Sequence, residues 1–362
     1  MNNHGVLPGR PSIAAVALIG IGLAVWMTAP AAFFRGWLIG WLFWSGLSLG
    51  ALPILMLQWL TGGAWGTALR RPCEAVAGTT PLIAILFIPI VFGAPQIFPW
   101  AAPDFFVRHN WPHKQVYLNL PFFAVRALIY FAILIALATV LRSLSRRAEV
   151  VRLERISAAG LIVYFLLMIF ASTDWVASLI PEWRSSIFPV IFIVSQFLSS
   201  LAFGIAVVCW ADLKGVITPS IPEKPLHDLG NLLLAFVIFW TYVSFAQLLL
   251  IWAGNLPKEI SWYTPRSSGG WQYVALVLAL LQFAVPFALL LSRAAKRHRQ
   301  RLGVIAGIVL GASVINVWWL VAPSLNPSRL TFPLVDCLLF VAIGVLWMAV
   351  FLRIFNREVK HV

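Results

Sequence analysis

Charged residues are scarce in this sequence, since only 10% of its 362 residues are Asp, Glu, Lys or Arg. Soluble globular domains carry about a quarter of such residues, so the composition excludes an ordinary soluble protein. Hydrophobic residues make up 61% of the chain, and the mean hydropathy is +0.91. The chain is therefore expected in a membrane. Its net charge of +14 arises from Lys and Arg in short segments between apolar runs, where they set topology, so nucleic acid is not expected as a partner.

Residues that bind metals or haem are also few. The three cysteines, Cys73, Cys209 and Cys337, form no CxxC or CxxCH pattern, so the sequence has no motif for an iron–sulfur cluster, a zinc ion or a c-type haem. All six histidines fall in predicted loops or termini, whereas a membrane b-type cytochrome needs axial histidines within its helices. We therefore expect the chain to bind no metal or cofactor directly, and we assign no catalytic residue.

Apolar runs of about 20 residues, without the alternation of barrel strands, predict transmembrane helices. The first run ends in TAPAAFF and could be mistaken for a secretory signal, but the many later runs favour a retained first helix. We predict an all-α multipass membrane protein with ten spans and no inserted soluble domain. The spans are Ser12–Ala29, Trp37–Leu60, Ala77–Phe98, Asn119–Leu141, Ser157–Leu179, Ile187–Trp210, Leu229–Trp252, Trp271–Leu291, Leu302–Val321 and Pro333–Phe355.

The spans suggest a division into two blocks. If the first and last spans are set aside, spans two to five and spans six to nine remain, joined by the segment Asp174–Phe188. We therefore predict two four-helix bundles with flanking helices. The four parts are residues 1–36 (tail and first helix), 37–186 (first bundle), 187–322 (second bundle) and 323–362 (last helix and tail).

Lys and Arg are distributed unequally between the two sides of the predicted spans. The side of the amino terminus carries 18 of them and the opposite side seven. This asymmetry predicts that both termini are cytoplasmic. The opposite loops, such as Pro99–Leu118 and Ala253–Gly270, are rich in Trp, Tyr, Pro and Asn. Interfacial anchoring accounts for most of the tryptophans, and a surface for docking partner proteins is an additional interpretation.

Two charges are predicted inside neighbouring spans. Arg126 lies about seven residues into span four, which is roughly 10 Å below the outer surface, and Asp174 lies at a comparable depth in span five. A short loop joins these antiparallel spans, so an Arg126–Asp174 ion pair is expected. The pair could fix packing only. Alternatively, the pair could form a proton-handling or quinol-facing site on the outer side, where the carboxylate could accept a proton.

Four further polar residues are candidates for a proton path. Glu74 is expected in the first turn of span three, where it would cap the helix or admit protons from the cytoplasm. Asp228 opens span seven, and Tyr242 and Gln247 lie within it. Their side chains could hydrogen-bond neighbouring helices, which is the favoured interpretation, or carry protons through bound water.

A short motif, Gly46-Leu47-Ser48-Leu49-Gly50, matches the G-x-S-x-G pattern of a hydrolase nucleophile. That motif needs a strand-to-helix turn and a histidine partner, whereas here it lies inside a helical run. Small residues at a contact between helices explain it better.

Several polar clusters, taken together and in order, resemble one family, the ActF-type membrane subunit of alternative complex III, which is related to NrfD-like subunits. The resemblance extends from Trp41 to Pro323. Its marks are LTGGAWG, RRPCEA, PLIAILFIPI, FPWA, KQVYLN with FFAVR, DWVASLIPEWRSSIF, HDLGN to GGW, and FAVPFALLLSR.

The resemblance implies a ten-span subunit of a respiratory quinol:electron-acceptor oxidoreductase in the bacterial cytoplasmic membrane. It implies partner subunits that carry the multihaem cytochrome c and the iron–sulfur clusters, together with a second NrfD-like subunit. It leaves open whether this subunit contacts quinone or quinol, or moves protons through half-channels in its two bundles. The subunit is not expected to be catalytic alone.

The sequence departs from the family in the segment after Asp174 and Trp175, which are retained. Glu182 stands where the family has histidine, and Arg184 stands where it has an aromatic residue. Any partner contact or proton step made through that histidine is therefore in doubt. The alternative function is a secondary transporter, which would also have two helix blocks. Transporters use broken helices around a central site, however, and the charges here lie towards the membrane faces.

Overall fold

The computed structural model describes residue 22 and residues 25–216, 220–326, 330 and 334–360. Within these residues every regular element is a helix, and nine helical segments are long and apolar enough to cross a membrane. The chain is an all-α multipass membrane protein. The nine segments are Pro30–Thr61, Ala64–Phe92, Leu120–Arg146, Val150–Leu179, Phe188–Leu213, Glu223–Gly254, Trp271–Leu291, Arg299–Leu325 and Leu334–Glu358.

Seven of these spans are built around one long helix each. They are α2 (Pro30–Thr61), α9 (Leu120–Arg146), α10 (Val150–Trp175), α11 (Phe188–Leu213), α12 (Glu223–Gly254), α17 (Arg299–Leu325) and α18 (Leu334–Lys360). The other two spans are composite. One consists of α3 (Ala64–Ala77), α4 (Thr80–Leu86) and α5 (Ile88–Phe92), and the other of α14 (Trp271–Leu278), the π-helical turn η4 (Ala279–Ala284) and α15 (Val285–Leu291).

Short helices lie between the spans. They are α6 (Ala94–Ile97), η1 (Pro99–Ala101), α7 (Phe105–His109), α8 (Pro112–Tyr117), η2 (Ala177–Leu179), α13 (Pro257–Ile260), η3 (Thr264–Arg266) and α16 (Arg293–Arg297). Three histidines predicted in loops lie instead in helical turns, namely His109 in α7, His113 in α8 and His227 in α12.

Two predicted spans differ from the structure or fall outside it. Most of the expected first span, Ser12–Ala29, lies outside the described residues. The expected third span, Ala77–Phe98, was placed too late, because the helical segment already begins at Ala64. It is interrupted rather than regular. Pro81 and Pro89 stand in the first turns of α4 and α5, where the missing N–H breaks the hydrogen-bond ladder of a continuous helix.

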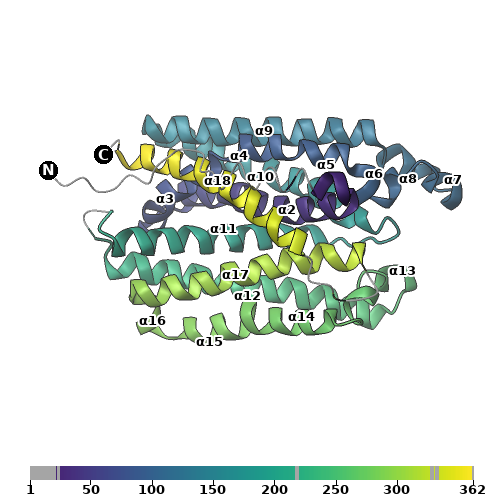
Figure 1. The fold of residues 1–362 in the computed structure, drawn as a ribbon. Coiled ribbons are helices and arrows are strands. Elements are labelled where there is room, and N and C mark those ends of the chain that lie inside the picture. The colour runs from purple at the N-terminus through teal and green to yellow at the C-terminus, as the bar shows by residue number, and fades with distance from the viewer. Residues whose placement is uncertain (1–21, 23–24, 217–219, 327–329, 331–333, 361–362) are drawn as a thin grey trace.

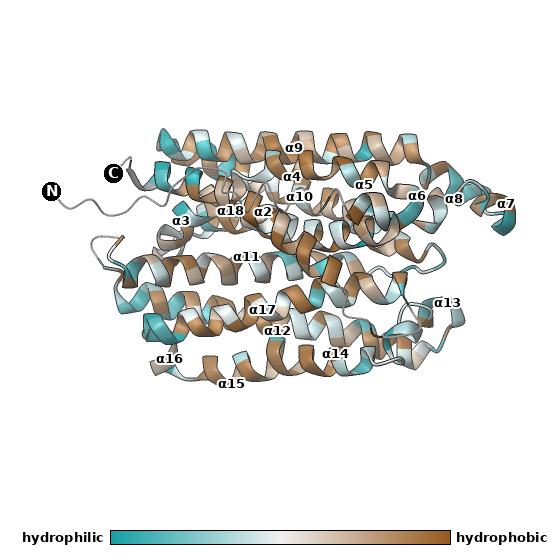
Figure 2. Ribbon diagram, viewed as in Figure 1, coloured by the Kyte–Doolittle hydropathy of each residue, from teal (hydrophilic) through white to brown (hydrophobic). Residues whose placement is uncertain are grey.

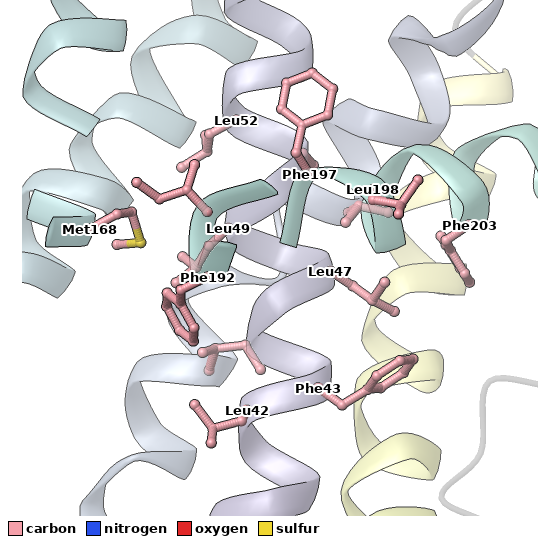
Figure 3. Packing of buried hydrophobic residues seen from close by; sticks show 14 of the residues in the cluster. Leu42, Phe43, Leu47, Leu49, Leu52, Met168, Phe192, Phe197, Leu198 and Phe203 are labelled. Atoms are coloured by element: carbon pink, nitrogen blue, oxygen red, sulfur yellow. The ribbon is translucent and has the colours of Figure 1, made fainter. Parts of the chain in front are cut away.

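The centre of the molecule is formed by α2 and α11, which contact each other. In their most apolar stretches, 94% of the residues of α2 and 83% of those of α11 are buried, more than in the other spans. The helix α2 also packs against α3, α10 and α18, and α11 packs against α10, α12 and α17. Figure 3 shows leucine and phenylalanine side chains of α2 and α11 packed around this contact. Because α2 contacts helices from both predicted halves, the division into two bundles stays a prediction.

The two ends of the molecule differ in composition. The helices run side by side, with α7, α8 and α13 at one end and α16 and the end of α18 at the other (Figure 1). Hydrophobic residues dominate the middle of the helices, and hydrophilic residues gather at both ends (Figure 2). The end that carries the basic segments contains ion pairs between helices, such as Arg142–Glu358 and Arg299–Asp212, each 2.8 Å long. The basic segments thus share one end, although their orientation in the membrane stays a prediction.

One glycine of the GLSLG motif, Gly50, allows α2 to approach α11 closely, in agreement with the interpretation of small residues at a helix contact. A Cβ atom on Gly50 would lie 2.2 Å from the backbone oxygen of Gln196 in α11, which is too close for any real contact. A Cβ atom on Gly46 would lie 3.5 Å from the flexible side chain of Gln196, an ordinary contact. Gly50 is therefore the position at which α2 and α11 lie too close together for any side chain larger than that of glycine.

We predict that Gly50→Ala lowers the free energy of unfolding by about 1–3 kcal/mol, because the methyl group would push α11 away from α2. Gly46→Ala is the matched control on the same helix, and it should be neutral or slightly stabilising, since alanine favours helix. Denaturation of the purified protein in detergent measures both. Equal effects of the two substitutions would contradict this account of the contact.

Candidate functional site

The structure brings Arg126 and Asp174 together as the sequence predicted. Arg126 Nε donates to Asp174 Oδ2 and Nη2 donates to Oδ1, each at 2.8 Å, so the pair is bidentate. Both residues are buried, with 6% and 1% of their surface exposed. Arg126 stands near the start of α9 and Asp174 near the end of α10, so the pair joins the two helices at one end of the hairpin. Such geometry compensates two charges that would otherwise be costly to bury.

Two tyrosines extend this pair in opposite directions. The Tyr130 hydroxyl, one helical turn further along α9, donates to Asp174 Oδ2 at 2.9 Å. On the other side, the backbone carbonyl of Tyr117 accepts from Arg126 Nη1 at 2.8 Å, and its ring lies 3.8 Å from Arg126 Cζ. Burial, and next the charge of Asp174, raises the pKa of the Tyr117 phenol. These four residues run from α8 into α9 and α10. We call them the outer network, after the side of the membrane on which the sequence predicts this end to lie.

Glu74 lies in a different place from the one predicted. It stands near the carboxyl end of α3, so it does not cap the first turn of a span. The helix starts at Ala64, which places the RRPCE sequence inside α3 rather than at the start of a helix. Glu74 is buried and accepts a hydrogen bond from Ser145, at the end of α9 remote from Arg126. It therefore does not join the outer network.

The three candidate residues of α12, which are Asp228, Tyr242 and Gln247, lie in different surroundings. Asp228 lies in the first turns of the helix, partly exposed, with its carboxylate 3.9 Å from His227 Nδ1. Tyr242 is 67% exposed and points away from the neighbouring helices, whereas Gln247 is only 2% exposed. Tyr242 and Gln247 therefore lie on different faces of α12 and do not share one proton path. Residues 240 and 247 share one helix face, and residue 242 lies about 200° around the helix from 240, since each residue turns about 100°.

Gln247 lines a cavity of about 400 Å³ between α11, α12, α14, η4 and α17. The cavity wall is mainly apolar, and Arg266 of η3 lies in it, 2% exposed. The sequence indicated Arg266 only as a charge in an outer loop. Its burial depends on how that loop folds against α17, which no local pattern reveals.

A row of uncharged polar groups lies where α11 meets its neighbours, and sequence reasoning did not single it out. Trp240 Nε1 and Asn316 Nδ2 both donate to Ser195 Oγ, at 3.0 and 3.3 Å. The row continues on either side, through the hydroxyl of Tyr164, which donates to Gln196 Oε1, and through Gln282 Nε2, which donates to Ser313 Oγ. These residues are distributed over the five elements α10, α11, α12, η4 and α17. The only feature of the sequence that pointed to this row was an amide side chain within an apolar run.

No metal centre is found in the part of the chain that the structure describes. There, His, Cys, Asp and Glu side chains form no group of three or more that could hold a metal ion. Cys73 and Cys209 are buried singly, without a disulfide.

We predict that Asp174→Asn lowers the free energy of unfolding by roughly 3–5 kcal/mol, because it leaves the Arg126 charge buried without a partner. The double variant R126M/D174L should recover most of this loss, since an apolar pair of similar volume needs no compensation. Asp228→Asn, at a partly exposed position, is the control and should change stability by less than about 0.5 kcal/mol. Denaturation in detergent measures all three. A double variant at least as unstable as Asp174→Asn would contradict the pairing account.

Comparison with known proteins returned no match, neither to a protein-family model nor to a curated protein. Assignment of a function therefore depends on the geometry of the chain itself together with its sequence motifs. Three buried polar regions are available for this: the outer network, the central polar row, and the cavity that contains Arg266.

Proposed function

We propose that this protein is a membrane-embedded subunit of a respiratory quinol:electron-acceptor oxidoreductase of the alternative complex III type, in a bacterial cytoplasmic membrane. In this role it would support quinol oxidation by handling protons. The observation that carries the proposal is the outer network, in which a buried carboxylate is placed between a tyrosine inside the membrane span and one in an end loop. The sequence resemblance, which includes both Arg126 and Asp174, supplies the assignment to this class of complex.

The outer network has the parts of a short proton relay. Oxidation of a quinol to a quinone releases two protons with two electrons, and a positioned carboxylate can accept such protons. Asp174 Oδ2 already accepts the Tyr130 hydroxyl hydrogen. A proton that moves from Tyr130 to Asp174 would weaken the contact with Arg126, and Tyr130 would be reprotonated from the membrane side. Arg126 would stabilise the carboxylate after Asp174 gives up the proton at this end of the molecule.

The loops at the same end are tied into a continuous surface, as expected of a docking face for partner subunits. Lys114 Nζ donates to the carbonyl of Pro181 at 2.6 Å, and Trp183 Nε1 donates to the carbonyl of Glu259 at 3.1 Å. The rings of Trp183 and Trp262 stack with centroids 4.3 Å apart. Loops from both halves of the chain therefore hold one another in place.

The residues that depart from the family lie on this surface. Glu182 and Arg184 are exposed, whereas Trp183 between them is buried. Burial, and next the charge of Arg184, lowers the pKa of Lys114, while Glu182 opposes the shift. Both departures thus lie at exposed positions, where they would alter the charge presented to a partner.

We predict that gentle purification from the native membrane yields this chain together with a multihaem cytochrome c, an iron–sulfur protein and a second multipass subunit. Mass spectrometry of the purified assembly identifies the components, and haem absorption measures their stoichiometry. A chain that migrates alone under conditions that preserve other respiratory complexes would contradict the proposed assembly.

We predict that Tyr130→Phe slows quinol-linked proton release by on the order of tenfold or more, because it removes the hydroxyl that feeds Asp174 while keeping the ion pair. The purified complex in proteoliposomes, with a pH indicator and an electron acceptor, gives the rates of proton release and electron transfer. Tyr273→Phe at an exposed position of α14 is the matched control. Unchanged proton release, together with an unchanged pH profile, would rule out the relay.

A secondary transporter is the second candidate, and the central polar row favours it. Ser195, Gln196 and Asn316 lie where helices of both predicted halves meet, which is the region where transporters bind substrate. The helices α2 and α11 are continuous there, however, and the row contains no charge. Solute uptake by the isolated chain in proteoliposomes, abolished by Asn316→Leu, would establish transport instead of the complex.

A further inference from the structure

In the part of the chain that the structure describes, Arg266 is a buried cation without an acidic partner. Its guanidinium is held by acceptors of the protein, because Nη1 donates to the carbonyl of Trp262 at 2.7 Å and Nη2 donates to the carbonyl of Leu320 at 2.6 Å and to Ser324 Oγ at 2.9 Å. The Trp262 ring lies 3.5 Å from Arg266 Cζ. Among the described residues, no carboxylate lies within 4.0 Å of the guanidinium, and Nε has no hydrogen-bond partner.

The contrast with Arg126 shows what Arg266 lacks. Both guanidinium groups lie at the same end of the molecule and rest against aromatic rings. Arg126 has a bidentate carboxylate, whereas Arg266 has only neutral acceptors. Burial lowers the pKa of Arg266, as expected of a cation without an opposite charge. A guanidinium nevertheless keeps its proton in proteins. The fold therefore buries a guanidinium charge that no carboxylate of the described chain neutralises.

The cavity beside Arg266 contains two further polar atoms without partners. In the described part of the chain, neither Gln247 Oε1 nor Ser244 Oγ makes a hydrogen bond. Both residues line the same cavity as Arg266, on the side of α12. Buried polar atoms are rarely left unpaired, and exceptions often mark a place that a ligand or water fills. Three unpaired polar atoms on one cavity, one of them the Nε atom of a guanidinium, indicate a binding site.

The remaining wall of the cavity indicates the chemistry of the rest of the ligand. It is formed by aromatic and aliphatic side chains such as Phe245, Leu248 and Leu278. Phe245 and Leu248 are also exposed on the outside of α12, so the wall continues onto a membrane-facing surface. The π-helical turn η4 borders the cavity, and such turns are frequent at functional sites. A small soluble anion would leave this wall uncovered, and a neutral amphiphile would leave Arg266 uncompensated.

We propose that this cavity binds an anionic phospholipid, with a phosphate oxygen on Arg266 Nε, headgroup hydroxyls towards Gln247 and Ser244, and an acyl chain along α12 and α14. Basic groups between membrane helices recognise lipid phosphates by charge complementarity. The lipid would fasten the η3 loop to the α12–α14 edge, beside the Trp183–Trp262 stack of the outer surface. This site is independent of the proposed respiratory role and goes beyond it.

The test measures lipid binding by the purified, delipidated full-length chain in detergent, using native mass spectrometry. Dioleoylphosphatidylglycerol should bind more tightly than dioleoylphosphatidylcholine, and Arg266→Gln should weaken its binding by about tenfold or more. Arg293→Gln, at an exposed position of the opposite end, is the charge control and should have no effect. Equal binding of the two lipids by the unmodified chain would overturn the proposal.

A second pair of variants separates binding from folding. Ala275→Phe would fill the cavity and leave Arg266 in place, whereas Ala136→Phe adds the same bulk to an exposed face of α9. The first should abolish selective binding of phosphatidylglycerol, and the second should not. Displacement of phosphatidylglycerol by inorganic phosphate would identify a soluble-anion site, and stronger binding of oleate would identify a carboxylate site. Either result would overturn the assignment to a phospholipid.

Discussion

The cost of burying charge in an apolar surrounding governs the structure of this protein. A membrane-spanning chain has no water with which to solvate an isolated guanidinium or carboxylate, so each buried charge needs a partner within the protein or its ligands. Arg126 and Asp174 meet this requirement through two hydrogen bonds of 2.8 Å. The pair joins α9 to α10 and orders the tyrosines on either side. Arg266 meets this requirement only in part, since its hydrogen-bond acceptors are neutral. Because of this difference we propose a ligand for Arg266 and a proton relay at Arg126 and Asp174.

The central contact between α2 and α11 provides the rigid frame in which those charges are held. Helix association in a membrane depends on close packing, because lipid is as apolar as the helix surfaces. Gly50 permits that packing against the backbone of Gln196, and Ser48 of the same motif hydrogen-bonds Thr79 at 2.7 Å and accepts from Trp347 Nε1 at 2.8 Å. One short motif of small residues therefore connects α2 to α11, to the start of α4 and to α18. The polar regions lie around this frame, and none of them interrupts it.

The three polar regions differ in what they can do chemically. The outer network contains an ionisable acid that accepts a hydrogen bond from the Tyr130 hydroxyl, so it suits the proposed transfer of protons. The central row contains only neutral groups, so it suits hydrogen bonding between helices or to a neutral solute. The Arg266 cavity has an unpaired positive charge and an apolar wall, so it suits an amphiphile. The central row and the Arg266 cavity adjoin each other, since Trp240 and Asn316 of the row also line the cavity, whereas no residue of the outer network does.

The sequence by itself determined the fold class, most spans and the Arg126–Asp174 contact. Long apolar runs predict membrane spans directly. Arg126 and Asp174 lie at matching depth on an antiparallel hairpin, where few other charged partners are available. Tertiary structure decided what local patterns do not contain. It turned Tyr242 outwards and Gln247 inwards on one helix, extended the third span back to Ala64, and buried Arg266. In each of these cases the outcome depends on which neighbouring element covers a side chain, and that information is distributed over distant parts of the chain.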